Sequence, residues 1–258
     1  MRGDLRVRRY MSPGVLSVAP TASLPHVHEQ LSRARVSSAP VVDAHGSALG
    51  MISLTDMLRV GETESVDGFG ERIVQLPDVP VHEVMTRGLI TLEATATVRR
   101  AARMMLKHRV QRLVVVDDEQ LRGVIAARDV VRAVADSGNE VAVSEYMSEP
   151  VESVDVRRTL REAVDQLDGR RHSLVVLRDG RPVGAFTQAD ALAARQVLDD
   201  LRVEERMSSN VVVVGDRVPV DRVARRFIAA SAPLAVVMWE GLGPAGVLSA
   251  TDFLYAAL

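Results

Sequence analysis

Four copies of one short motif constrain the fold of this chain more than any other feature. Each copy starts at a glycine, continues through two apolar residues and ends at an aspartate six positions after the glycine. The copies read GMISLTD at 50–56, GVIAARD at 123–129, GAFTQAD at 184–190 and GVLSATD at 246–252. A pattern that recurs along a chain indicates repeated structural units.

A second marker precedes each motif in the same register. It reads Val-x-x-x-Met followed by serine or threonine, and its methionines stand at positions 11, 85, 147 and 207. Each methionine comes 43 to 45 residues before the aspartate of the next glycine motif. Because the spacing between the two markers is nearly constant, they define one structural unit that is repeated four times.

Between the markers, β-rich runs and helix-period segments follow each other in the same order in every copy. The helical periodicity is clearest at 98–107 and 220–229. First strands are predicted at 15–18, 90–92, 151–154 and 211–214, and second strands at 39–42, 113–116, 174–177 and 234–238. The glycine motif then supplies a third strand and a closing helix. We therefore predict an α/β protein of four tandem β-α-β-β-α repeats.

The repeat boundaries follow from these markers. Repeats 1 to 4 span 1–60, 81–139, 140–198 and 199–258, and 61–80 is a connector. The connector reads as a polar loop followed by a short helical or extended segment. A unit of about fifty residues buries too little surface to be stable alone. We therefore expect repeat 1 to pair with repeat 2, and repeat 3 with repeat 4.

Composition excludes several classes of function. The chain has 32 basic and 34 acidic residues and only 3% aromatics, which argues against nucleic-acid binding. It has no cysteine, so disulfides and thiolate metal sites are excluded. No apolar run approaches a membrane span and no catalytic motif is present. We expect a cytoplasmic protein that is not an enzyme, requires no cofactor, holds no metal and does not bind a membrane.

The polar end of each glycine motif has two readings. A serine followed three residues later by an acid is typical of a helix capping box. A helix N-terminus is also a binding site for anions, and a glycine in the preceding strand lets a ligand approach closely. The second copy has Ala126 where the hydroxyl is expected, so a capping box cannot form there, yet Asp129 remains. Both readings stay open at this point.

The chain resembles the cystathionine β-synthase (CBS) domain family over nearly its whole length. The resemblance rests on the Met-(Ser/Thr) lead-in, on the strand Ala39-Pro40-Val41-Val42-Asp43 and on the four glycine motifs. It implies two pseudo-twofold pairs, called Bateman modules. The layout is similar to that of the γ subunit of AMP-activated kinase and of stand-alone archaeal CBS proteins, in which the repeats form a flattened disc around a central channel.

The resemblance also implies a function. It indicates a non-catalytic regulatory protein that binds AMP, ADP or ATP in clefts between repeats and senses energy state; S-adenosylmethionine and NAD are other ligands of the family. An unidentified regulated protein and a second copy of the chain, in a homodimer, are the expected partners. The alternative is a ligand-free scaffold in which the motifs only cap helices.

Site residues carry over position by position. Aspartates would bind the ribose diol at Asp56, Asp129, Asp190 and Asp252, and hydroxyls would come from Ser53, Thr55, Thr187, Ser249 and Thr251. By family alignment, Arg112 and His172 would contact phosphate. The first-ranked site combines Ser53, Thr55 and Asp56 with Thr86, Val110 and Arg112; the second combines Ser249, Thr251 and Asp252 with Ser148, Val151 and His172. The irregular second copy puts binding at Asp129 in doubt.

Overall fold

Each repeat begins with a single helical turn that the Val-x-x-x-Met marker encodes. The computed structural model describes residues 5–66, 71–117, 120–167, 173–194, 201–241 and 243–258. The opening turns are α1 (Val7–Tyr10), α4 (Val81–Val84), η1 (Val143–Glu145) and η2 (Val203–Glu205). The valine that begins each turn is fully buried. The marker therefore anchors the start of every repeat in the core.

The strands lie where the sequence predicts them, with one exception. Repeats 2, 3 and 4 each contain one parallel and one antiparallel pairing, in the orders β9-β8-β7, β10-β11-β12 and β13-β14-β15. Their bounds are β7 (Thr91–Glu93), β8 (Arg112–Asp117), β9 (Gln120–Ala126), β10 (Ser153–Asp155), β11 (Ser173–Arg178), β12 (Arg181–Thr187), β13 (Val211–Gly215), β14 (Leu234–Trp239) and β15 (Gly243–Leu248). Repeat 1 has β2 (Ser38–Val42) and β3 (Ala48–Ser53), but the strand predicted at 15–18 is reduced to one bridge between Val18 and Val41.

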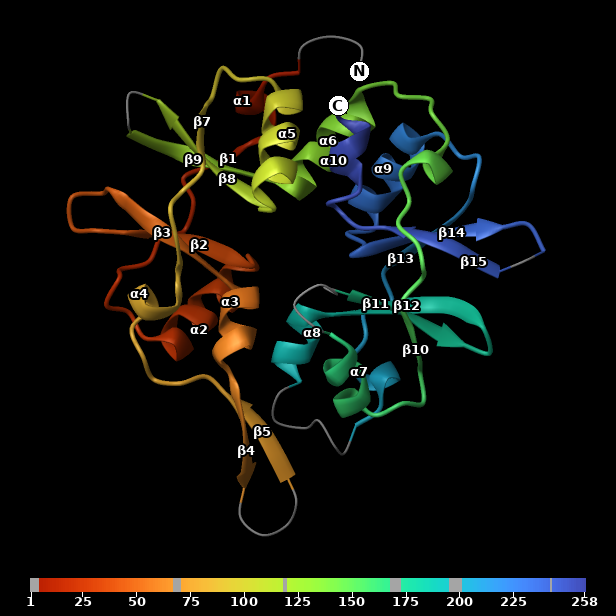
Figure 1. Cartoon of the computed structure of the whole chain (residues 1–258), viewed down its shortest axis with the longest axis horizontal. Coiled ribbons are helices and arrows are strands. Elements are labelled where there is room, and N and C mark those ends of the chain that lie inside the picture. The colour runs from red at the N-terminus through yellow and green to blue at the C-terminus, as the bar shows by residue number, and fades with distance from the viewer. Residues whose placement is uncertain (1–4, 67–70, 118–119, 168–172, 195–200, 242) are drawn as a thin grey trace.

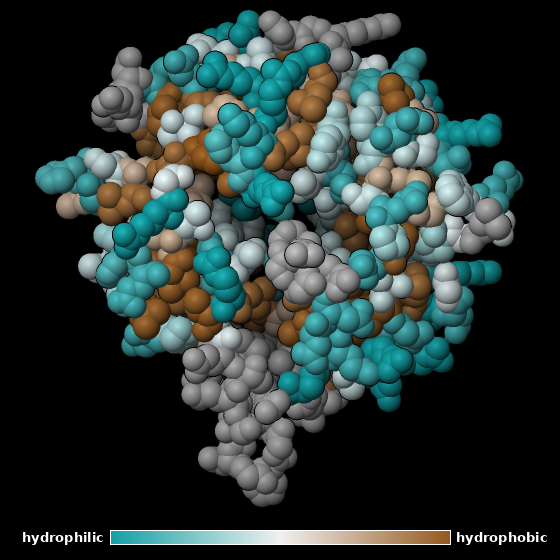
Figure 2. Space-filling model, in the orientation of Figure 1, coloured by the Kyte–Doolittle hydropathy of each residue, from teal (hydrophilic) through white to brown (hydrophobic). Residues whose placement is uncertain are grey.

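Two helices complete each repeat. The helices between the first and second strands are α2 (Leu24–Ala34), α5 (Val98–His108), α7 (Leu160–Gln166) and α9 (Val220–Ala229). The closing helices are α3 (Leu54–Val60), α6 (Ala127–Asp136), α8 (Gln188–Ala193) and α10 (Phe253–Ala256). The repeats are arranged in a ring, with repeats 1 and 2 on one side and repeats 3 and 4 on the other (Figure 1). The same face is hollowed at its centre in the space-filling view (Figure 2).

The connector forms a β-hairpin, which the sequence did not predict. Its strands β4 (Glu62–Val66) and β5 (Glu71–Gln75) pair antiparallel with Glu62 opposite Gln75. Figure 1 shows the hairpin projecting from the edge of the disc below repeat 1. The segment is therefore extended, but it folds back on itself.

Paired repeats exchange the segment that follows their first helical turn. From repeat 1, β1 (Ser12–Pro13) pairs antiparallel with β9 of repeat 2. From repeat 2, β6 (Thr86–Arg87) pairs antiparallel with β3 of repeat 1. Repeats 3 and 4 make the same exchange through bridges that join Ser148 to Val247 and Ala185 to Ser208. Each sheet of a pair therefore has its edge covered by the other repeat.

The glycine of each motif lies where this exchanged segment crosses. A Cβ added to Gly50 would lie 2.7 Å from both the Met85 sulfur and the Thr86 carbonyl oxygen. A Cβ added to Gly246 would lie 2.5 Å from the Met147 sulfur. The interpretation that these glycines leave room for a ligand is wrong, because the methionine marker of the paired repeat fills that space.

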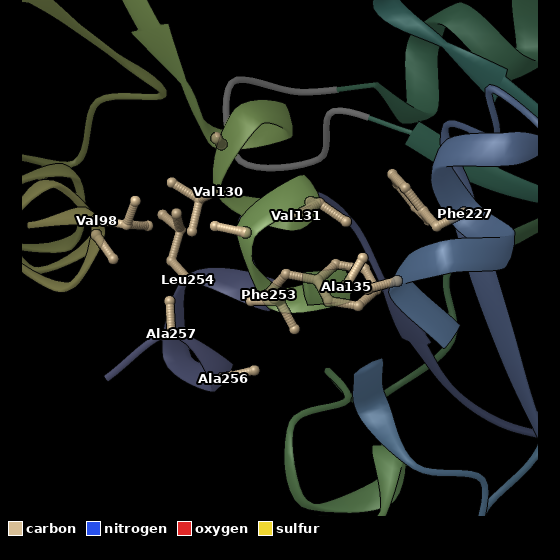
Figure 3. Packing of buried hydrophobic residues seen from close by; sticks show 14 of the residues in the cluster. Val98, Val130, Val131, Ala135, Phe227, Phe253, Leu254, Ala256 and Ala257 are labelled. Atoms are coloured by element: carbon tan, nitrogen blue, oxygen red, sulfur yellow. The ribbon is translucent and has the colours of Figure 1, made fainter. Parts of the chain in front are cut away.

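The two modules join mainly through repeats 2 and 4. Helices α5 and α6 share one apolar core with α9 and α10 (Figure 3). At its centre the rings of Phe227 and Phe253 pack edge to face with centroids 5.2 Å apart. Repeats 1 and 3 meet where α3 faces α8, and Leu192 of α8 joins the core of repeat 1. The ring is therefore held closed by hydrophobic burial on one side.

We predict that Gly246→Ala lowers the free energy of unfolding by about 1–3 kcal/mol, because the new methyl group overlaps Met147 in a packed site. Gly215→Ala is the matched control, since no atom lies within 4 Å of a Cβ there. Urea unfolding of the two variants measures the difference. Equal stability of both variants would show that the close approach is not a packing constraint.

Candidate functional site

A cavity of about 390 Å³ lies where repeats 1, 2 and 3 meet. The six residues of the first-ranked site all line it, from the closing motif of repeat 1 and the lead-in and second-strand turn of repeat 2. These are Ser53, Thr55, Asp56, Thr86, Val110 and Arg112. Thr187, predicted for another copy of the site, lines the same cavity from repeat 3. Leu89 and Ile90 add apolar surface.

Asp56 is the best-connected polar group in this cavity. Its Oδ2 accepts hydrogen bonds from the Ser53 backbone N–H at 2.9 Å and from the Ser53 hydroxyl at 2.6 Å. Its Oδ1 accepts longer bonds from the Thr86 hydroxyl at 3.2 Å and from Arg59 at 3.3 Å. Oδ2 therefore completes the capping box of α3, while Oδ1 is held by weaker contacts.

Arg112 brings positive charge to the opposite wall. Its guanidinium donates a hydrogen bond to the Ser37 hydroxyl of repeat 1. Burial lowers the pKa of this guanidinium, and the Asp129 carboxylate opposes the shift only in part. A partly dehydrated cation with a neutral hydroxyl partner favours the approach of an anion.

Several lining residues come from contacts that sequence reasoning missed. The hydroxyl of Thr55 donates to the side-chain oxygen of Gln188 at 2.9 Å, across the contact between the two modules. Ser37 and Ser38 line the cavity from the turn equivalent to the one that carries Arg112. The pseudo-twofold pairing of repeats could have placed the two serines, but no periodicity in the chain could have placed Gln188.

The second-ranked site is only partly assembled in the described residues. Asp252 accepts hydrogen bonds from the Ser148 hydroxyl at 2.5 Å and from the backbone and hydroxyl of Ser249 at 2.6 Å and 2.7 Å. Val151 packs against a separate apolar cluster of repeats 3 and 4. His172 lies outside the described residues. Thr251 is half-buried in a turn, and the closing helix α10 begins only at Phe253.

The other two aspartates are enclosed by their own repeats. Asp129 accepts from the Ala126 backbone at 2.8 Å and from Arg132 at 2.8 Å, so the N-terminus of α6 is capped without a hydroxyl. Asp190 accepts from the backbone and hydroxyl of Thr187 at 2.8 Å and 2.7 Å. Burial raises the pKa of both carboxyls, although these hydrogen bonds oppose the shift.

The described ranges can also be searched for groups of metal-binding side chains and for membrane-spanning helices. No group of three or more histidine, cysteine, aspartate or glutamate side chains there could hold a metal ion. No helix in the same ranges is long and apolar enough to cross a bilayer.

The comparisons with known proteins identify the family. The model of the CBS domain matches residues 7–62, 81–136 and 143–196, which together exceed half of the chain. The chain therefore belongs to the CBS-domain family, and its two pairs of repeats are Bateman modules. Residues 199–258 lie outside these matches but contain strands in the same order as repeat 3.

Relatives of two kinds are found. Inosine-5'-monophosphate dehydrogenase of Halobacterium salinarum is 29% identical over 192 residues, which are 69% of this chain and 35% of the enzyme. The chain thus spans about a third of the length of that relative. Protein MJ1225 of Methanocaldococcus jannaschii is 24% identical over 93% of this chain and 94% of its own length.

Solved structures show the same four-repeat architecture. The crystal structure of MJ1225 has a TM-score of 0.79 and 21% identity, and the match covers 98% of this chain and all of that chain. An uncharacterized conserved protein from Pyrococcus horikoshii has a TM-score of 0.68 and 22% identity with the same coverage. The likeness to stand-alone archaeal CBS proteins is confirmed at the level of fold.

The raised pKa of Asp190 leads to a prediction about stability and pH. An acid whose pKa is higher in the folded than in the unfolded state destabilises the fold when it ionises, so this cost appears as pH rises through the folded pKa. We expect Asp190→Asn to unfold at higher temperature than the parent at pH 7, and the difference to shrink at lower pH. Thermal unfolding between pH 4 and pH 7 measures it.

Glu162→Gln is the matched control, because Glu162 forms an equivalent capping box with Thr159 on α7. A backbone hydrogen bond from Thr159 lowers the pKa of this carboxyl, so its ionised form stabilises the fold. The glutamine variant should therefore unfold at lower temperature at pH 7, with the difference again shrinking as pH falls. A pH-independent difference for Asp190→Asn would contradict the proposed cost of burial.

Proposed function

We propose that this chain is a non-catalytic regulatory protein that binds an adenosine nucleotide in the cavity between repeats 1 and 2. The observation that carries the proposal is the convergence of Asp56, Thr86 and Arg112 on one cavity of about 390 Å³. That volume lies within the range of small-molecule sites, and its wall combines apolar side chains with a few polar groups. Sensing of AMP, ADP or ATP is the role that this site would serve.

The ribose would bind at Oδ1 of Asp56. The contacts of this atom with Thr86 and Arg59 are the longest that the carboxylate makes, and the Arg59 side chain is 67% exposed. A ribose diol can replace them with shorter, charge-assisted hydrogen bonds. The bonds at Oδ2 can remain, so the cap of α3 need not break when the ligand binds.

The phosphate would lie near Arg112. Because this guanidinium is partly dehydrated and bonded to a neutral serine hydroxyl, an anionic oxygen improves its environment more than it would improve that of a solvated arginine. Adenine would then pack between Leu89, Ile90 and Val110. Each part of the nucleotide would thus contact a different wall of the cavity.

The position of the site also suggests how ligand binding would change the conformation of the protein. Its wall contains Thr187 and Gln188 of repeat 3, and the Thr55–Gln188 hydrogen bond joins the modules beside it. A ligand that binds one arrangement of the modules more tightly than another shifts the population toward it. Nucleotide concentration would in this way change the shape presented to a regulated protein or to a second copy of the chain.

We predict that Asp56→Asn weakens binding of AMP or ATP by about 1–3 kcal/mol through loss of charge-assisted hydrogen bonds, which corresponds to roughly 5- to 150-fold. The asparagine oxygen can still accept a hydrogen bond from the Ser53 backbone. The thermal midpoint of the ligand-free variant should therefore stay close to that of the ligand-free parent. Isothermal titration calorimetry with AMP, ADP, ATP, S-adenosylmethionine and NAD measures the affinities.

Glu162→Gln serves again as the control, since it removes a capping carboxylate that does not line the cavity. It should bind as the parent does. Affinity near the micromolar level, about −8 kcal/mol, supports sensing. Absence of binding up to millimolar ligand favours the scaffold alternative, and ATP recovered as ADP after long incubation would contradict the non-catalytic assignment.

A further inference from the structure

A second hollow, of about 620 Å³, lies on repeat 4 and shares no lining residue with the cavity of the candidate site. It is formed by the turn between β13 and α9, by the exposed face of α9 and by the end of β14. Its charged and aromatic lining residues are Asp216, Arg217, Arg222, Arg226, Trp239 and Glu240. We call this group of residues the rim hollow.

Trp239 distinguishes this surface from the corresponding part of the other repeats. It is the only tryptophan in the chain, and it is 44% exposed. It ends the second strand of repeat 4, at the position that Asp117 and Arg178 occupy in β8 and β11 by strand register. A large aromatic side chain at a position that is charged in sister repeats favours a binding role over simple solvation.

The rim hollow contains three arginines. Arg217, Arg222 and Arg226 are exposed, and the part of the chain that the structure describes gives none of their guanidinium groups an ion pair or hydrogen bond. By contrast, Arg225 on the same helix pairs with Asp221 at 2.7 Å and donates to the Ala135 carbonyl at 3.1 Å. Helix α9 thus has one face fixed against repeat 2 and another with free donors.

We propose that the rim hollow is a docking surface for an acidic peptide segment of a protein partner. Arginine forks bind carboxylates in two-bond geometry, and tryptophan and arginine are the side chains most enriched at interface hot spots. Trp239 would contact an apolar or aromatic side chain of the segment. Asp216 and Glu240 leave the rim hollow with a net positive charge of one, which suits a mixed acidic and apolar sequence.

A nucleic-acid ligand fits these observations less well. Single-stranded nucleic acids require a series of stacking side chains along a basic groove. The rim hollow offers one aromatic ring, and the whole chain carries a formal net charge of −2. The inference does not depend on nucleotide binding at the central cavity, because none of the lining residues is shared between the two.

The test uses Trp239 as its own reporter, since no other tryptophan contributes to the emission. The full chain is titrated with the capped peptide EEEELFEEE and, separately, with its lysine counterpart KKKKLFKKK. We expect a saturable change in tryptophan emission with the acidic peptide only. The double variant with Arg222→Gln and Arg226→Gln should weaken this binding by about tenfold or more, because two charge-assisted contacts are lost.

The matched control carries Arg99→Gln and Arg103→Gln, which remove two exposed arginines at the same spacing from α5. It should bind the acidic peptide as the parent does. Trp239→Ala is tested by anisotropy of a fluorescein-labelled peptide and should also bind more weakly. Circular dichroism confirms that each variant is folded.

Three results would overturn the proposal. The first is no saturable emission change with the acidic peptide up to millimolar concentration. The second is an equal loss in both double variants, which would indicate nonspecific attraction to surface charge. The third is binding of inorganic triphosphate or of an oligodeoxythymidylate without binding of the peptide.

Discussion

The fold depends on the exchange of one short segment between paired repeats. The Met-(Ser/Thr) segment of one repeat crosses the glycine strand of its partner so closely that a Cβ at Gly50 would meet Met85 and Thr86. A repeat alone would expose this strand edge and bury too little surface. The exchange also brings polar groups of two repeats together, because the hydroxyl residue after the methionine reaches the aspartate of the paired repeat. Thr86 reaches Asp56 and Ser148 reaches Asp252 in this way.

The two contacts between the modules differ in kind, and this difference accounts for the irregular second motif. Arg128 occupies the position of Thr55, donates to the Ala232 carbonyl at 3.0 Å and lies over the Phe227 ring. It therefore helps to join repeats 2 and 4 through an apolar core. Thr55 instead meets Gln188 beside the cavity of the candidate site. One motif position thus serves packing on one side of the ring and the candidate site on the other.

The sequence predicted the features that recur at the same position in every repeat. The offsets between markers predicted the order of strands and helices, and the family resemblance grouped six residues that line one cavity. The role of the glycines was misread, because a close approach looks the same in sequence whether the neighbour is a ligand or another segment of the chain. Gln188 and the hairpin at 62–75 could not be predicted, since contacts between modules and the fold of a connector leave no periodic signal.

The capping and ligand readings of the aspartates are compatible, because the two oxygens of one carboxylate do different work. At Asp56, Oδ2 holds the backbone and hydroxyl of Ser53, which fixes the orientation of the side chain. A side chain that is already fixed would accept a ligand's hydrogen bond through Oδ1 without the entropy cost of ordering it when the ligand binds. A capping box in this position would therefore also preorganise an acceptor for the proposed ligand, so the cap and the proposed binding role do not exclude each other.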